Sequence, residues 1–282
     1  MRLETMKDIL IKARKGKYGV GAFEFWSLDS AQAVVEGANE VGVPAILQVG
    51  DIETAFAGGV HNIVRLANMA AEGSKVPIAL HLDHAVEYKF ICEALDAGFT
   101  SVMIDASKLA LKENMKITQK VVKQAQKYGA TVEAELGKVG GAESSIVVDE
   151  AEATQTDPDE AVKFVNETGI DALAVAIGTI HGFYRSEPKI NIERLKKIAS
   201  KVSIPLVLHG GSGTPHDKVQ ETIQHGIAKI NICTEFQAAY GKNYTYTQQQ
   251  EGFRFSAPTF FAPGKQAGKE LVISKMKLFA GK

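Results

Sequence analysis

Three histidines in this sequence stand at the same kind of position, where a short apolar run ends. His84 ends the run IALHLDHA, His181 follows ALAVAIGTI, and His209 follows PLVL. Three protein ligands and one open position are the arrangement of a catalytic zinc site, and imidazole is a preferred zinc ligand. A single histidine in such a place is more often a hydrogen-bonded core residue. Taken together, however, the three predict a metal centre if the fold brings the ends of these runs together.

Carboxylates stand close to these histidines in the sequence pattern. Glu133 and Glu135 are one residue apart in TVEAELG, so they would share one face of a strand. Buried charges are costly unless they are paired or lie near a cation, and a metal would meet that need. Glu143 follows a glycine-rich stretch, where a movable loop could bring a base to a substrate.

The four remaining histidines are assigned structural positions. His81 lies on the same strand face as Asp83 but deeper in the run, so we expect it to support the site rather than to bind a metal. His61, His216 and His225 fall in stretches with helical periodicity, and we expect them at the surface.

The run HGGSGTP, which contains Gly210 and Gly211, is a candidate anion site. Glycines between a strand and a helix expose backbone N–H groups that can hold a phosphate. The alternative is a tight turn in which Thr214 and Pro215 begin the helix.

Eight short, almost continuously apolar runs are predicted to be strands covered on both faces; they are residues 18–25, 44–50, 77–83, 100–106, 131–137, 172–178, 205–210 and 228–233. Amphipathic stretches lie between them, at 27–42, 58–73, 111–129, 157–169, 190–202 and 215–226. This alternation predicts an α/β fold, a (β/α)₈ TIM barrel. An open doubly wound sheet is the second choice, because no GxGxxG motif follows the first strand.

In such a barrel the active site lies where the strands end, and phosphate often binds after the seventh and eighth strands. The barrel would therefore bring the three histidines together beside HGGSGTP. We expect one domain over residues 1–282, with a C-terminal extension in which a loop from residue 243 precedes a final helix. That extension could pack on the barrel or on a neighbouring subunit.

Composition excludes several classes of protein. The chain has 282 residues with 32 basic and 33 acidic side chains, a formal net charge of −1, which gives no electrostatic footprint for nucleic acid or an acidic membrane surface. The longest apolar runs are too short to span a bilayer. The N-terminal segment lacks the apolar core of a signal peptide, and only two distant cysteines are present. We therefore expect a cytoplasmic protein.

Five motifs together resemble the class II, zinc-dependent ketose-bisphosphate aldolases, in particular the tagatose-bisphosphate and short fructose-bisphosphate aldolase branch. The motifs are LHLDHA (80–85), VEAELGKVGGAE (132–143), GTIHGFY (178–184), LVLHGGSG (206–213) and KINICTE (229–235). The likeness extends over nearly the whole chain.

The resemblance implies roles for individual residues. Asp83 would protonate the oxygen that becomes the C4 hydroxyl, and Glu143 would remove the C3 proton of dihydroxyacetone phosphate. Glu135 and Asp105 would lie near the metal as supporting or alternate ligands. The zinc ligands would be the three histidines His84, His181 and His209. The ketose and its phosphate would be held by Gly182, Gly210, Ser212, Asn231 and Thr234, and a monovalent cation (Na⁺ or K⁺) often assists at that phosphate.

The implied activity is the reversible aldol cleavage of a phosphorylated ketose, such as fructose or tagatose 1,6-bisphosphate, to dihydroxyacetone phosphate and an aldehyde. Homodimers or homotetramers are common in this family, and some tagatose-type members need a separate stabilising subunit. Two alternatives remain: a metal-dependent sugar-phosphate epimerase or isomerase, and a non-catalytic sugar-phosphate-binding subunit. A lysine Schiff base could also support aldol chemistry, but Lys229 begins the last strand and is expected at the far end of the barrel.

The chain departs from the family pattern near the expected mouth. Glu24 stands where relatives usually carry asparagine, Gly50-Asp51 replaces a serine position, and Ala85-Val86 replaces a Gly-Ser pair. The acidic cluster after the glycines is thinned to Ala142-Glu143-Ser144. Because added carboxylates repel a phosphate, we expect an aldehyde half that differs from glyceraldehyde 3-phosphate, either unphosphorylated or bearing another polar group.

Overall fold

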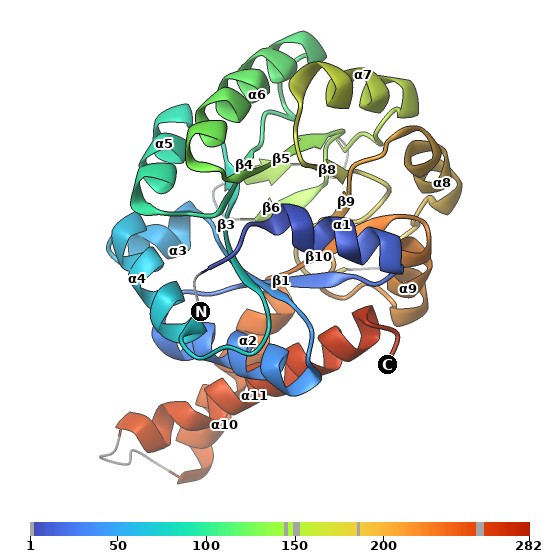
Figure 1. Cartoon of the computed structure of the whole chain (residues 1–282). Coiled ribbons are helices and arrows are strands. Elements are labelled where there is room, and N and C mark those ends of the chain that lie inside the picture. Colours follow the sequence, from blue (N-terminus) through green and yellow to red (C-terminus); the bar gives the residue numbers. More distant parts are fainter. Residues whose placement is uncertain (1–2, 144–145, 149–152, 185–186, 252–256) are drawn as a thin grey trace.

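The computed structural model describes residues 3–143, 146–148, 153–184, 187–251 and 257–282. Eight parallel strands form a closed barrel in the order β1-β10-β9-β8-β5-β4-β3-β2 (Figure 1). The barrel strands are β1 (Val20–Glu24), β2 (Ala45–Val49), β3 (Ile78–Ala85), β4 (Ser101–Ile104), β5 (Thr131–Leu136), β8 (Ala172–Val175), β9 (Leu206–Leu208) and β10 (Ile227–Ile232). Each coincides with one of the eight apolar runs, so the predicted TIM barrel is confirmed.

Helices surround this barrel on its outside, so every residue of the barrel strands is buried and the strands have no solvent-exposed face. In chain order the helices are α1 (Met6–Gly16), α2 (Leu28–Val41), α3 (Asp51–Phe56), α4 (Val60–Ala71), α5 (Tyr88–Ala97), α6 (Leu111–Ala125), the 3₁₀ turn η1 (Gln126–Tyr128), α7 (Pro158–Thr168), α8 (Ile192–Lys201), α9 (His216–Gln224), α10 (Thr234–Glu251) and α11 (Ala257–Phe279). The described helices include none that is long and apolar enough to cross a membrane.

Helix α1 closes the end of the barrel at which the strands begin. Its buried residues Met6, Ile9 and Leu10 pack on small inward-facing residues of the strands, among them Ala22 and Ala174. Figure 1 shows α1 lying across the barrel. The opposite end, where the strands terminate, is therefore left to form the site.

Three features differ from the sequence-based expectation or add to it. Helices α3 and α5 and a small antiparallel hairpin of β6 (Gly141–Glu143) and β7 (Ile146–Val148) were not among the predicted elements. Helix α3 has six residues and the hairpin strands have three each, too few for a periodic signal. Helix α5 was missed although its buried residues Ile91, Ala94 and Leu95 recur at helical spacing.

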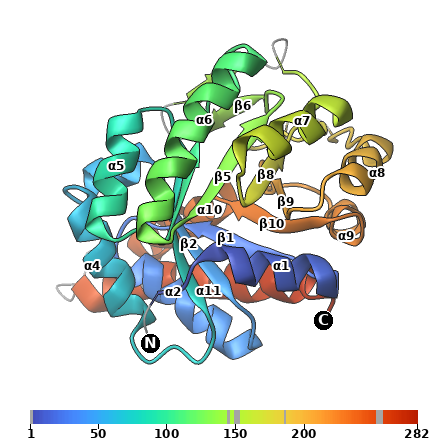
Figure 2. The same cartoon turned by 45° about the horizontal axis from the view of Figure 1, so that its top comes forward.

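The loop predicted from residue 243 is wrong in its first part, because α10 continues to Glu251. Aromatic residues four positions apart on α10 explain the difference. The ring centroids of Phe236 and Tyr240 are 5.2 Å apart, and those of Tyr240 and Tyr244 are 5.9 Å apart. Tyr244 also meets Phe261 of α11 at 5.4 Å, so α10 and α11 pack as a pair beside α2 (Figures 1 and 2).

Candidate metal centre

The three histidines at the strand ends converge on one point. His84 lies in β3, His181 in the loop after β8, and His209 directly after β9. Their ring centroids are 5.0 Å apart for His84 and His181, 4.5 Å for His84 and His209, and 5.8 Å for His181 and His209. One ligand atom of each lies within 4.8 Å of the others, and all three side chains are buried.

The backbone of His84 is strained. Its φ of 45° lies in the left-handed region, which disfavours a residue with a Cβ. The pairing register between β3 and β4 shifts at the same place. Strain of this kind is concentrated at functional sites, and here it accompanies the turning of the imidazole toward the other two.

A carboxylate orients His84 from the opposite side. Nδ1 of His84 lies 3.0 Å from Oδ2 of Asp105, and Oδ1 of Asp105 accepts a bond of 3.0 Å from the Ser107 N–H. Burial opposes ionisation of Asp105, but His84 and Ser107 outweigh it and hold the pKa of Asp105 well below its usual range. An ionised Asp105 fixes the imidazole tautomer, so that Nε2 is the nitrogen available to a metal.

His209 is held between two carboxylates. Its Nε2 lies 3.0 Å from Oε1 of Glu133, and its Nδ1 lies 3.1 Å from Oε2 of Glu135. Burial and the neighbouring His84 lower the pKa of His209, but Glu133 and Glu135 prevail and raise it to about 9. Glu135 and Asp105 also form, with His84, a second group of possible ligands within 4.8 Å of one another. The structure therefore brings both predicted carboxylates to the histidine cluster.

Lys229 corrects two expectations from the sequence. It is the third residue of β10, and its fully buried ammonium lies 3.0 Å from Oε2 of Glu133 and 3.7 Å from Oδ1 of Asp83. The expectation that Lys229 lies at the far end of the barrel is therefore wrong, because its long side chain reaches the carboxylates beneath the histidines. Glu133 is also paired with this lysine rather than dependent on a metal: burial opposes its ionisation, but Lys229 and His209 lower the pKa of Glu133 to about 2.

Asp83 sits beside the cluster with fixed partners. Its Oδ2 accepts a hydrogen bond of 3.0 Å from Nδ2 of Asn231, and its Oδ1 lies 3.3 Å from Nε2 of His81. Burial disfavours the charged form, but Lys229 and His84 hold the pKa of Asp83 well below its usual range. His81 in turn contacts Oγ of Ser101 at 2.8 Å, which fits the supporting position expected for it. The three other histidines lie on or beside helices α4 and α9, away from the cluster: His61 and His216 are exposed, and His225 is partly buried.

The glycine run after β9 lies against its neighbours with almost no space for side chains. Gly210 has a φ of 67°, and a Cβ added there would stand 2.3 Å from the carbonyl oxygen of Ile180. A Cβ on Gly211 would stand 2.6 Å from the carbonyl oxygen of Asn231. Glycine is required at both positions, and the loops after β8 and β9 and the end of β10 are brought into contact.

The remaining predicted phosphate-binding residues border this run. Ser212 is buried, and its Oγ accepts a bond of 3.2 Å from the N–H of Glu235 in the first turn of α10, which begins at Thr234. Gly182, next to His181, has a φ of 92°. Asn231 was predicted to contact substrate, and the structure places its amide on Asp83.

Glu143 is the last residue of β6. The neighbouring backbone is tied to the metal centre, because the carbonyl of Gly140 accepts a bond of 2.8 Å from the N–H of His181. The Glu143 side chain lies outside the described part of the structure, so its catalytic role stays a prediction.

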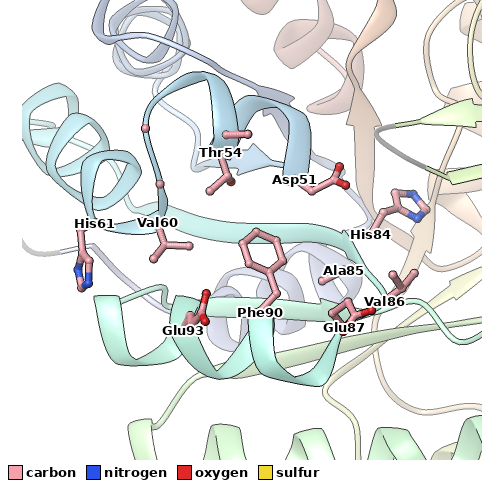
Figure 3. A pocket seen from close by; sticks show the side chains of 13 residues that line it. Asp51, Thr54, Val60, His61, His84, Ala85, Val86, Glu87, Phe90 and Glu93 are labelled. Atoms are coloured by element: carbon pink, nitrogen blue, oxygen red, sulfur yellow. The ribbon is translucent and has the colours of Figure 1, made fainter.

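A pocket of about 460 Å³ opens beside His84, between the segments that follow β2 and β3 (Figure 3). It was not predicted, since one of its walls is α5, which the sequence pattern did not reveal. The walls include the side chains of Asp51, Val60, His84, Val86, Glu87 and Phe90.

Comparisons with known proteins agree with this geometry. The family model described as fructose-bisphosphate aldolase class II matches residues 4–282. A fructose-bisphosphate aldolase of Geobacillus stearothermophilus is 41% identical over 281 residues, 99% of this chain and 97% of the relative. One of Staphylococcus epidermidis is 39% identical over 281 residues, 99% of this chain and 98% of the relative.

A solved structure shares both sequence and fold. The crystal structure of the YdjI aldolase from Escherichia coli K12 superposes with a TM-score of 0.86 at 34% identity, covering 99% of this chain and 97% of the other. Class II aldolases depend on a metal, and the histidine cluster is a group that could hold one. The chain therefore belongs to the class II fructose-bisphosphate aldolase family, and it is a lyase that cleaves a carbon–carbon bond.

Proposed function

We propose that the protein catalyses the zinc-dependent, reversible cleavage of a ketose 1-phosphate to dihydroxyacetone phosphate and an aldehyde. The observation that carries the proposal is the convergence of His84, His181 and His209 within 4.8 Å. The donor set fits zinc, because three imidazoles leave one coordination position open. Asp105 and Glu133 hold the outward nitrogens of two of these rings, as carboxylates commonly do behind zinc ligands.

A bound zinc ion would supply a Lewis acid that polarises the ketose carbonyl and stabilises the negative charge that develops during cleavage. Asp83 would act on the aldehyde half. Because Lys229 and His84 keep Asp83 ionised, it can accept the C4 hydroxyl proton as the C3–C4 bond breaks. In the condensation direction Asp83 returns that proton to the aldehyde oxygen.

Glu143 is the proposed partner of Asp83 in proton transfer. During cleavage it would deliver a proton to C3, and during condensation it would remove the C3 proton of dihydroxyacetone phosphate. Its position after the glycines of β6, next to the backbone bond that joins Gly140 to His181, supports this role.

The phosphate of the ketose would bind at the glycine run after β9 and at the start of α10, where backbone N–H groups gather. The proposed contacts are Gly182, Gly210, Gly211, Ser212, Asn231 and Thr234, with a monovalent cation, Na⁺ or K⁺, at the phosphate. Gly210 and Gly211 support this role because they pack the backbone of the run closely against Ile180 and Asn231. We further propose a cytoplasmic homodimer or homotetramer.

A panel of ketose phosphates tests the proposal. The protein is stripped with a chelator, zinc is added back, and release of dihydroxyacetone phosphate is followed with a coupled assay. Zinc-dependent release is expected. Conversion of a ketose phosphate to an isomer without release of a triose phosphate would favour the epimerase alternative, and binding without turnover would favour the non-catalytic one.

A further inference from the structure

The pocket beside His84 lies on a different side of the metal centre from the proposed phosphate site. The glycine run follows β9, and α10 follows β10, whereas the pocket is formed by segments after β2 and β3. In the closed barrel, β1 separates β10 from β2. A ketose whose phosphate binds after β9 and β10, with its carbonyl at the histidines, therefore directs its other half toward this pocket. This step rests on the proposed function.

Asp83 supports the same direction. It precedes His84 in β3, and the pocket wall continues from His84 through Ala85 and Val86. The group proposed to exchange a proton with the aldehyde oxygen thus lies in β3, the strand that leads into the pocket. The aldehyde carbon and its substituent would therefore both lie toward the pocket beside His84.

The charge of the pocket is unfavourable to an anion. Three carboxylates line it, those of Asp51, Glu87 and Glu93, and the described lining contains neither lysine nor arginine. Lys89 lies 3.7 Å from Glu93, but it is exposed and does not line the pocket. A phosphate here would meet repulsion from these carboxylates, and the described lining offers it no lysine or arginine.

Two backbone donors at the start of α3, beside the pocket, are occupied by carboxylates of the same helix. The N–H of Gly50 donates to Oε2 of Glu53 at 3.3 Å, and the N–H of Ile52 donates to Oδ1 of Asp51 at 2.9 Å. These donors begin α3 beside the pocket. Since the chain's own carboxylates take these two N–H groups, they are not offered to a phosphate.

The rest of the pocket wall is mostly apolar, and its other polar side chains are those of Thr54, His61 and His84. Val60, Val86 and Phe90 face it together with Ala85 (Figure 3), and its volume is about 460 Å³. Such walls bind carbon chains by excluding water. They offer little to a short, strongly hydrated anion.

We propose that this pocket receives the aldehyde half of the substrate and selects an uncharged, unphosphorylated aldehyde. The substrate class is then a ketose 1-phosphate whose distal end bears no phosphate, rather than a 1,6-bisphosphate. Bond making and breaking are those of the proposed reaction; only the group attached to C4 differs.

The test compares two aldehydes that differ only in the phosphate. Zinc-loaded protein condenses dihydroxyacetone phosphate with D-glyceraldehyde or with D-glyceraldehyde 3-phosphate, and kcat/KM is measured for each. A preference of about tenfold or more for the unphosphorylated aldehyde is expected from the charge of the pocket. Equal values, or a preference for the phosphorylated aldehyde, would overturn the inference while leaving the proposed function intact. Failure to consume dihydroxyacetone phosphate with either aldehyde would overturn both.

A variant links the preference to the pocket. Asp51→Asn removes one pocket carboxylate while keeping its size, and it should shift the ratio of the two kcat/KM values toward the phosphorylated aldehyde by about fivefold to tenfold. Glu113→Gln, an exposed change on the outer helix α6, is the matched control and should leave the ratio unchanged. An unchanged ratio in Asp51→Asn would show that the pocket does not set the preference.

Discussion

The buried layer inside the barrel and the pocket at its rim are built in opposite ways. In the layer, His209, Glu133 and Lys229 are fully buried, and each lies within 3.0 Å of a partner of complementary charge or hydrogen-bonding character. At the rim, Glu87 and Glu93 are exposed, and the described lining provides no lysine or arginine for them. If the proposed function is right, the layer determines whether the reaction occurs, because its groups depend on one another. The rim would then determine which aldehyde reacts, because its exposed charges are not part of that layer.

The largest expected effect separates two histidines that both line the pocket, His84 and His61. His84→Ala removes a proposed zinc ligand, so bound zinc should be lost and kcat should fall about 10⁴-fold. His61→Ala, on the exposed face of α4, should keep its bound zinc, because His61 lines the pocket without belonging to the histidine cluster. Zinc content by elemental analysis and release of dihydroxyacetone phosphate measure the two effects. Retention of zinc and activity in His84→Ala would show that His84 is not a zinc ligand.

The second prediction concerns stability and compares two lysines. Lys229→Met leaves Glu133 and Asp83 buried without their cation, and removal of one partner of a buried ion pair costs about 3 kcal/mol. Lys89→Met removes an exposed partner of Glu93, where little is expected. Urea unfolding of the zinc-loaded proteins measures both.

A double variant distinguishes the buried charge from simple loss of packing. Glu133→Gln combined with Lys229→Met removes charge from both sides of the pair and should restore part of the lost stability. If the two changes are additive instead, the layer is not held by the coupling of Glu133 and Lys229.

The smallest expected effect concerns Glu24, which the sequence placed near the mouth as an added charge. Its Oε2 accepts bonds from the Cys233 thiol and from Nε2 of Gln237, the latter at 3.4 Å, and Glu24 does not line the pocket beside His84. Glu24→Gln should therefore change the ratio of kcat/KM for D-glyceraldehyde and D-glyceraldehyde 3-phosphate by less than about threefold. If Glu24→Gln changed this ratio as much as Asp51→Asn does, the selectivity would depend on Glu24 in β1 rather than on the pocket.

The sequence was sufficient to predict the barrel and the convergence of His84, His181 and His209 at one end of it. Parallel strands covered on both faces are continuously apolar, so the polar residues at their ends were conspicuous. His84, His181 and His209 could therefore be assigned to one end of the barrel before any distance was known.

Side-chain reach and short elements could not be predicted in the same way. Strand position alone puts Lys229 near the start of β10, but its four-carbon side chain is long enough to reach Glu133. Asp51 was identified as an added charge, whereas the pocket that it lines depends on the short helices α3 and α5. Such helices are fixed by packing on the barrel more than by their own periodicity.

Anomalous diffraction at the zinc edge, from crystals of protein prepared without chelators, would locate the metal ion itself. One strong peak per chain is expected, bound by ring nitrogens of His84, His181 and His209. The absence of a peak after addition of zinc, or a peak bound by other residues, would contradict the proposed zinc site.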